Sequence, residues 1–297
     1  MPVADFRSDQ AAGLRRLFGG GHLQVVSFAA GCSGVGKTAA VANLGVALAR
    51  QGREVLLIDE ASGGDDLAAA FGLLAPWDLL HVVQRECSLE QVLVRPQPGL
   101  HILPASRAAQ KLGALNGTQQ NILLEAVAGL ARPIDVILID AGVGHRQGFS
   151  PLGLIAQETV FVLSGNSASI TEAYTAIKKL SQVHGRRNFR ILINKVRCEA
   201  DARAIFDNMA HVAAQRGIAR LEYVASVPLD EAMRQTGQLC RPVVSAAPES
   251  VAAEAFRDIA AAMADWARQE AEAGGVEHFM QQLLHLSQRI PTTHPRI

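Results

Sequence analysis

A glycine-rich octapeptide between a strand pattern and a helix pattern constrains the fold of this chain more than any other feature. Residues 31–38 read Gly-Cys-Ser-Gly-Val-Gly-Lys-Thr and satisfy the pattern GxxxxGK[ST]. An apolar run at residues 23–29 precedes the octapeptide, and a helix-length stretch at residues 38–51 follows it. A loop of this composition at the junction of a buried strand and a helix is typical of a βαβ unit. The segment therefore favours an α/β fold.

Apolar runs and helix-length segments alternate along the rest of the chain. Further strands are expected at residues 54–58, 100–103, 136–139, 159–163 and 190–193. Further helices are expected at residues 119–130, 169–184, 201–217 and about 249–272. The strand patterns are nearly continuous in apolar residues, as in parallel strands buried on both faces. We therefore predict a doubly wound, mostly parallel sheet within residues 22–273.

Composition and charge exclude several other classes of protein. The 297 residues contain 28 Lys and Arg against 28 Asp and Glu, so the formal net charge is zero. Proteins that coat nucleic acids usually have a basic excess, so there is no strong case for nucleic-acid binding. No apolar run reaches the ~18 residues of a membrane-spanning helix, and residues 1–5 lack a signal-peptide pattern. The four cysteines form no CxxC pair, which fits a reducing compartment. We expect a cytoplasmic protein.

The octapeptide itself predicts a site for a nucleoside phosphate with Mg²⁺. Its glycines let backbone N–H groups approach phosphate oxygens, and the following helix directs its positive N-terminus at them. Lys37 is expected to hold the β- and γ-phosphates, and the Thr38 hydroxyl is expected to bind Mg²⁺. The residues predicted to bind nucleotide in this loop are Gly31, Ser33, Gly34, Val35, Gly36, Lys37 and Thr38.

A carboxylate at the end of a later strand supports this site. Residues 135–140 read Asp-Val-Ile-Leu-Ile-Asp, an apolar strand that ends in Asp140. The carboxyl ends of parallel strands are where ligands collect in open α/β folds, so Asp140 is expected beside the phosphate loop. We predict that it holds Mg²⁺ and orients the attacking water, which makes Lys37 and Asp140 the candidate catalytic pair. The alternative is a strand-end Asp that only caps the next turn.

These motifs make the chain resemble the MinD/ParA-type P-loop ATPases, and among them the FlhG (FleN) regulators of flagellar number. Residues 32–38 match the deviant Walker A sequence of that group from its third residue onward, and residues 140–144 resemble the switch after Walker B. Residues 227–230 and 237–244 resemble the adenine-side segment. Residues 9–15 match the DQAxxLR helix found in FlhG and absent from MinD. The resemblance implies binding of ATP or ADP.

The resemblance also implies a role for the N-terminal segment, residues 1–21, as an activator of a partner. In FlhG this helix stimulates an FlhF-type GTPase, and Gln10 is suited to orient a water molecule there. Leu14, Leu17 and Phe18 share one face of the expected helix, so docking on the protein's own sheet is the alternative. The residues expected to contact the partner are Asp9, Gln10, Leu14 and Arg15.

Three residues near the end of the sheet are implied to lie on the adenine side of the nucleotide. Related proteins present an Asn to the base, and Asn194 occupies that position here. An amide suits this contact because it both donates and accepts hydrogen bonds. Pro228 and Asp230 are expected to flank the base from the other side, and a simple turn is the alternative role for Asn194.

Two positions depart from the family pattern, and both departures concern hydrolysis. Cys32 stands where the family has a lysine that reaches across a dimer to the partner's nucleotide. Ungapped alignment places Ala61 where the family has an Asp that orients water. Losing one such group commonly costs about 10²- to 10³-fold in rate. We therefore predict nucleotide binding with weak or absent ATPase activity. Substitution by Glu60 is disfavoured because adjacent strand residues point to opposite faces.

The C-terminal segment, residues 274–297, contains an amphipathic helix pattern at residues 276–289. Its apolar face is formed by Phe279, Met280, Leu283 and Leu284. The resemblance implies a membrane-targeting helix, and hence peripheral attachment to the inner membrane. Surface-seeking helices usually carry several Lys or Arg, whereas this one has a single certain cation, Arg289. Packing on the body or on a partner is the alternative.

Together the patterns predict an FlhG-like cytoplasmic regulator of flagellar number or placement. The partners implied are an FlhF-type GTPase, a second copy in a nucleotide-dependent homodimer, and a flagellar transcription regulator or switch-complex protein. Two alternatives remain: a competent MinD-like ATPase that cycles on the membrane, and a ParA-like positioning protein that binds DNA. Strongly salt-dependent DNA binding would favour the second alternative.

Overall fold

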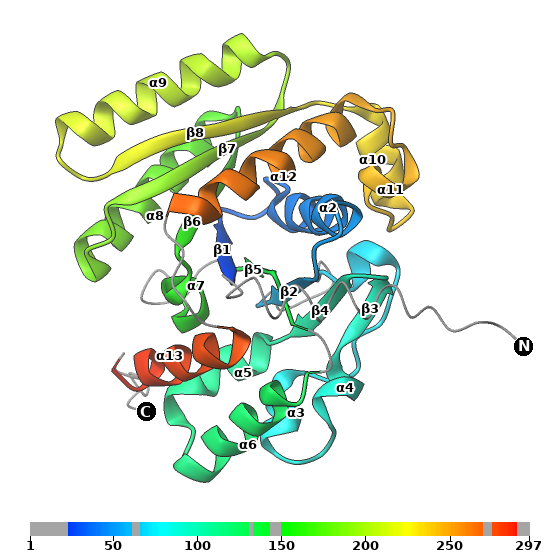
Figure 1. Ribbon diagram of the computed structural model, residues 1–297. Helices are drawn as coiled ribbons and strands as arrows, with labels where there is room; N and C mark the ends of the chain where they lie inside the picture. The colour runs from blue at the N-terminus through cyan, green and yellow to red at the C-terminus, as the bar shows by residue number, and fades with distance from the viewer. Residues whose placement is uncertain (1–22, 61–65, 131–132, 143–149, 270–274, 290–297) are drawn as a thin grey trace, which may run out of the picture.

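An eight-stranded sheet with helices on both faces forms the centre of the molecule (Figure 1). The computed structural model describes residues 23–60, 66–130, 133–142, 150–269 and 275–289. The strand order is β3-β4-β2-β5-β1-β6-β7-β8, and only β3 runs antiparallel to its neighbour. The strands are β1 Gln24–Ala29, β2 Val55–Asp59, β3 Val94–Gln97, β4 Leu100–Pro104, β5 Val136–Asp140, β6 Glu158–Ser164, β7 Asn188–Val196 and β8 Arg220–Pro228. The predicted doubly wound, mostly parallel fold is confirmed.

All six predicted strands are present, and two further strands lie at the edges of the sheet. Edge strand β3 is only four residues long and contains Pro96. Proline has no N–H to donate to a neighbouring strand, and this is tolerated at the edge of a sheet. Edge strand β8 carries Arg220 and Glu222 and is half-exposed along most of its length. Neither segment has the continuous apolar run that marks the central strands β2 and β5.

One face of the sheet is covered by α2 and α12, which pack side by side (Figure 1). Val26 and Phe28 of β1 and Leu138 of β5 point to this face and join one continuous apolar core. The elements of this layer are α2 Lys37–Arg50, α10 Glu231–Gln238, α11 Val243–Ala246 and α12 Val251–Gln269. The short helix η1, Ala69–Phe71, contacts α2.

The opposite face carries two groups of helices. Ile137 and Ile139 alternate with the residues of the first face, as expected for a strand, and pack beneath the helices that follow β2 and β4. Helices α8 Ser167–His184 and α9 Glu199–Gln215 cover the β6–β8 side. The other group comprises α3 Leu79–Val83, α4 Leu89–Val92, α5 Ser106–Lys111, η2 Leu112–Ala114, α6 Gly117–Ala128 and α7 Pro151–Ile155.

The C-terminal helix α13, Val276–Arg289, belongs to this second layer and contacts α6, α7 and η2 (Figure 1). The four residues predicted to enter a membrane are at most 4% exposed and lie in the core with Leu123 of α6 and Leu152 of α7. These residues are Phe279, Met280, Leu283 and Leu284. Of the two alternatives for this helix, the structure shows packing on the body. In this arrangement its apolar face is not available to a membrane.

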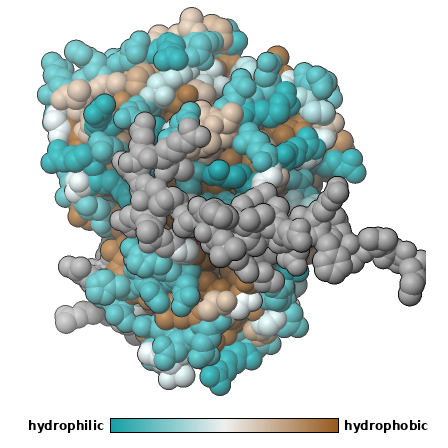
Figure 2. All heavy atoms as spheres, viewed as in Figure 1, coloured by the Kyte–Doolittle hydropathy of each residue, from teal (hydrophilic) through white to brown (hydrophobic). Residues whose placement is uncertain are grey.

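The hydropathy of the outer surface agrees with the burial of apolar residues in the core. Hydrophilic residues predominate over the top of the view in Figure 2, where α9 lies in Figure 1. Within the described ranges, no helix has the length and hydropathy that crossing a membrane requires.

Candidate nucleotide site

The loop between β1 and α2 is shaped by two glycines that approach other parts of the chain closely. A Cβ on Gly31 would lie 2.3 Å from the backbone nitrogen of Ala173 in α8. Gly36 has φ +87°, and a Cβ there would lie 2.4 Å from the Nδ2 atom of Asn194. Both positions therefore require glycine, one for contact with α8 and the other for a left-handed turn against β7.

The N-terminus of α2 is built to receive an anion. Gly36 is its N-cap and provides no side-chain hydrogen bond, and the first turn contains no acidic residue. The first N–H groups of a helix have no partner within the helix, and the helix dipole favours negative charge beside them. A phosphate group fits this position.

Lys37, Thr38 and Asp140 meet at this N-terminus. Asp140 ends β5 and is completely buried, while Lys37 is 7% exposed, and the two form an ion pair. The Thr38 hydroxyl donates to Asp140 Oδ2 at 2.8 Å. The oxygen atoms of Thr38 and Asp140 are the hard ligands that Mg²⁺ prefers, and Lys37 supplies charge for phosphate oxygens. The residues present therefore fit a nucleotide with Mg²⁺, and the expected meeting of Asp140 with the loop is observed.

Glu60, which directly follows β2, lies buried beside this cluster. Ser150 Oγ donates to its Oε1 atom, and the Gly142 N–H donates to its Oε2 atom at 3.0 Å. Burial raises the pKa of the Glu60 carboxyl above its usual range, although these two donors and Lys37 oppose the rise. Glu60 thus lies beside Lys37 and Asp140, contrary to the opposite orientation expected from strand alternation, and each of its carboxylate oxygens accepts one hydrogen bond in this structure.

The end of β7 holds the phosphate loop from the other side. Asn194 is buried, and its Nδ2 donates to the Val35 carbonyl oxygen at 2.9 Å. Lys195 Nζ donates to the Gly34 carbonyl oxygen at 2.7 Å, and Lys195 has a left-handed backbone with φ +58°. Asn194, which the resemblance implies to contact adenine, thus holds the backbone of the phosphate loop in this structure. Lys195 belongs to no motif of its own, and its position next to Asn194 is the one signal in the sequence for this contact.

Pro228 is the last residue of β8, next to the end of β7, and Asp230 follows two residues later. Pro228 lies opposite Val196 in the register of the two strands. Asp230 caps α10 by accepting from the Ala232 N–H at 2.8 Å, and it accepts from the Ala252 N–H at 2.9 Å. Partial burial acts to raise the pKa of the Asp230 carboxyl, but the hydrogen bonds from these backbone N–H groups outweigh it, so the pKa is lowered. The carboxylate fixes two helix starts, a role different from the implied contact with the base.

Of the two departures from the family pattern, Cys32 lies within the described residues and Ala61 does not. Cys32 is half-buried and packs against the apolar core of the α2 face, so no cation replaces the missing lysine at this position. Ala61 lies outside the described residues, as do the partner-binding residues predicted in the N-terminal segment. These are Asp9, Gln10, Leu14 and Arg15.

Comparisons with known proteins agree with this geometry. Residues 26–238 match the family described as "CobQ/CobB/MinD/ParA nucleotide binding domain". The chain is 32% identical to the antiactivator FleN of Pseudomonas aeruginosa over 262 residues, covering 88% of this chain and 94% of FleN. This chain is a MinD/ParA-family P-loop protein of the FlhG (FleN) type.

Solved MinD structures share the fold of this MinD/ParA-family chain. MinD of Aquifex aeolicus is 25% identical, with a TM-score of 0.63, and the match covers 82% of this chain and 97% of that one. MinD of Pyrococcus horikoshii, solved with Mg-ADP, is 24% identical with a TM-score of 0.62 over the same shares. The second likeness concerns the fold alone.

Proposed function

We propose that this protein is a regulator of flagellar number or placement that binds ATP or ADP with Mg²⁺. The observation that carries the proposal is the uncapped N-terminus of α2, where Lys37, Thr38 and Asp140 converge. Kinship with an antiactivator named FleN supports the flagellar role. The family includes MinD solved with Mg-ADP, which supports the nucleotide.

Hydrolysis in this proposal is weak. The phosphate loop has a thiol, Cys32, where the family has a charged lysine. The nearest additional carboxylate, Glu60, already accepts hydrogen bonds from Ser150 and Gly142. In this proposal water activation and charge stabilisation each lack a group, while Lys37, Thr38 and Asp140 hold the phosphates and Mg²⁺. The nucleotide then acts mainly as a bound signal.

Nucleotide binding is tested by calorimetric titration of Mg-ADP and a non-hydrolysable ATP analogue. Replacing Lys37 by alanine is expected to weaken binding at least tenfold, because the cation beside the phosphates is lost. The matched control is Lys111→Ala, which removes an exposed lysine of α5. Equal affinities for the wild-type chain and Lys37→Ala would refute the site.

The signal is passed to partners in two ways in this proposal. The DQAxxLR segment, with Asp9, Gln10, Leu14 and Arg15, stimulates an FlhF-type GTPase. Nucleotide binding promotes a homodimer that engages a flagellar transcription regulator or a switch-complex protein. The protein acts in the cytoplasm. Attachment to the inner membrane through α13 requires that helix to leave its place on α6 and α7.

Stimulation is measured as GTP turnover by an FlhF-type GTPase with and without the full chain. Gln10→Ala is expected to abolish stimulation, since the amide that orients the water is removed. Ser8→Ala, two residues earlier in the same segment, is the control and is expected to stimulate normally. Stimulation that survives Gln10→Ala would refute this role for the segment.

A further inference from the structure

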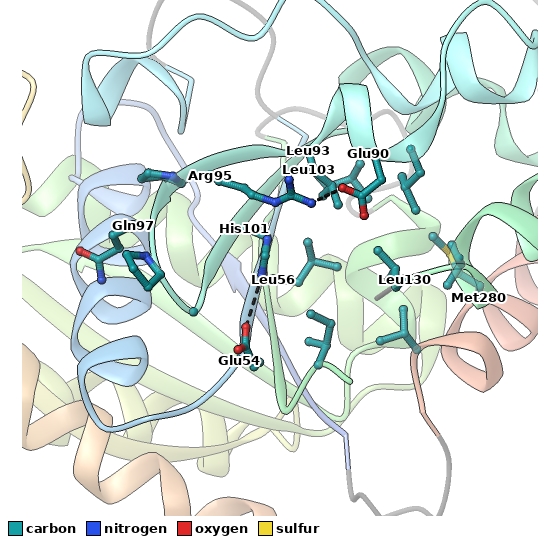
Figure 3. A pocket seen from close by; sticks show the side chains of 17 residues that line it. Glu54, Leu56, Glu90, Leu93, Arg95, Gln97, His101, Leu103, Leu130 and Met280 are labelled. Atoms are coloured by element: carbon teal, nitrogen blue, oxygen red, sulfur yellow. Dashed lines mark hydrogen bonds and ion pairs between the residues drawn. The ribbon is translucent and has the colours of Figure 1, made fainter. Parts of the chain in front are cut away.

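A cavity of about 600 Å³ lies between the β3–β4 hairpin, α4, α6 and the start of α13 (Figure 3). Glu54 and Gly99, which line it, directly precede β2 and β4. The cavity therefore lies at the amino ends of these strands, whereas Asp140 and the phosphate loop lie at the carboxyl end of the sheet. It is a site separate from the nucleotide site.

Apolar side chains form most of the cavity wall (Figure 3). Leu56 of β2 and Met280 of α13 are buried in the core of this face of the sheet, and Leu93 and Leu130 pack against that core while partly exposed. Covering such an apolar hollow removes its surface from water, which is favourable. The wall therefore favours an apolar occupant.

The titratable side chains that border this wall are paired. His101 Nε2 lies 3.3 Å from Glu54 Oε2, and Arg95 forms an ion pair with Glu90 (Figure 3). An occupant that contributes only apolar side chains leaves both pairs intact.

The first described residue, Leu23, lies close to this cavity and is buried in the same apolar core as its wall. Gln24 of β1 and Val55 of β2 both lie opposite Val136 of β5, so the starts of β1 and β2 are two strand spacings, about 10 Å, apart. Glu54, next to Val55, lines the cavity. The N-terminal segment is therefore attached to the sheet beside the cavity.

The sequence of the N-terminal segment predicts an apolar face that suits this wall. Leu14, Leu17 and Phe18 recur at helical spacing, and Gln10 precedes Leu14 by four residues, on the same face. The chain from Phe18 to Leu23 can span up to ~17 Å when extended. This reach exceeds the separation of about 10 Å between the starts of β1 and β2. The segment is long enough to bring its apolar face to the cavity.

We propose that residues 9–18 dock in this cavity of their own chain, with Leu14, Leu17 and Phe18 against its apolar wall. Gln10 lies on the docked face, so docking withholds the residue that is proposed to orient a water molecule in the partner GTPase. Docking is then an autoinhibitory contact, and the chain stimulates its partner only while the segment is released. The docking is independent of the proposed function, whereas its effect on stimulation rests on it.

Photo-cross-linking of the full chain tests the docking. p-Benzoylphenylalanine at position 18 is expected to form bonds with wall residues such as Leu130 and Met280, which mass spectrometry identifies. A mixture of isotope-labelled and unlabelled chains shows whether a bond joins residues of one chain. The same photoreactive residue at position 16, on the opposite side of the expected helix, is the control and should modify the wall at least tenfold less. Bonds to another surface only, bonds between chains only, or equal yields from both positions overturn the proposal.

Cavity-filling variants locate the docked segment. Leu93→Trp is expected to lower the yield of the bonds from position 18 at least fivefold, and Ile134→Trp fills the same cavity should the first variant fail to fold. The control is Leu239→Trp, at an exposed leucine that does not line the cavity. An unchanged yield in a folded cavity-filled variant overturns the proposal.

Stimulation of the partner GTPase tests the autoinhibitory role. Leu17 belongs to the docked face and is not among the residues expected to contact the partner, so Leu17→Ser should raise stimulation at least threefold at a subsaturating concentration of the chain. Arg16→Ser, on the opposite side of the expected helix, is the control and should stimulate as the wild type does. Equal stimulation by Leu17→Ser and the wild type overturns the autoinhibitory role. Absence of stimulation by every form refutes the proposed activator role instead, and the cross-links then decide the docking by themselves.

Discussion

Replacing Asp140 by asparagine removes the charge that balances Lys37 in the nucleotide-free site. Asp140 is completely buried and Lys37 is 7% exposed, so little water is available to solvate the remaining ammonium group. Removing one partner of a buried ion pair typically costs about 3–5 kcal/mol. We expect Asp140→Asn to lower the free energy of unfolding by about that amount in the absence of nucleotide.

The assay is urea denaturation of the nucleotide-free wild type, Asp140→Asn, Lys37→Met and the double variant. Because the two side chains contact each other, the double variant should lose less stability than the sum of the single variants, by about 1–3 kcal/mol. ADP without Mg²⁺ should stabilise Asp140→Asn more than the wild type, since its phosphates replace the missing counter-charge of Lys37.

The matched control is Asp258→Asn, which alters an exposed carboxylate of α12 and should change stability by no more than about 0.5 kcal/mol. The opposite result would be a loss below about 1 kcal/mol for Asp140→Asn together with additive single and double variants. It would mean that the ion pair contributes nothing measurable to the empty site.

Three further outcomes follow from the same contacts. Gly31→Ala should destabilise the protein by at least about 2 kcal/mol and weaken nucleotide binding, because a Cβ there meets the backbone of α8 at 2.3 Å; a normal urea midpoint would contradict this. Leu283→Ala, at a fully buried position of α13, should cost about 2–5 kcal/mol, and a cost under 1 kcal/mol would show that α13 does not pack stably. Because burial raises the pKa of Glu60, protonated Glu60 contributes stability below its ordinary pKa of 4.5, and this contribution is lost as pH rises through the folded-state pKa. Urea denaturation between pH 4.5 and about 8 should therefore show the wild type losing stability relative to Glu60→Gln, and parallel curves would exclude the raised pKa.

Much of the central fold was predictable because local pattern and tertiary environment coincide there. Strands β2 and β5 are apolar throughout and buried throughout, and the loop after β1 has an unambiguous motif. The meeting of Lys37 with Asp140 follows from two parallel strands ending at the same edge of one sheet.

The remaining features depend on contacts that no local pattern encodes. The bond between Glu60 and Ser150 joins residues 90 positions apart, and that between Asn194 and Val35 joins residues 159 apart. The sequence does not decide whether α13 is buried, because an amphipathic helix has the same pattern whether its apolar face meets a membrane or a protein core. Edge strand β8 lacks the apolar run because its exposure permits polar residues.

Nucleotide binding with little hydrolysis can be measured by single-turnover ATP hydrolysis together with identification of the bound nucleotide. The wild-type chain should bind Mg-ATP in a manner that depends on Lys37 and retain it mainly as ATP. The double variant Cys32→Lys with Ala61→Asp should convert it to ADP at least tenfold faster. Hydrolysis by the wild type at the rate of the double variant would show that the site hydrolyses ATP competently. Undiminished ATP binding by Lys37→Ala would show that the phosphate loop does not hold the nucleotide.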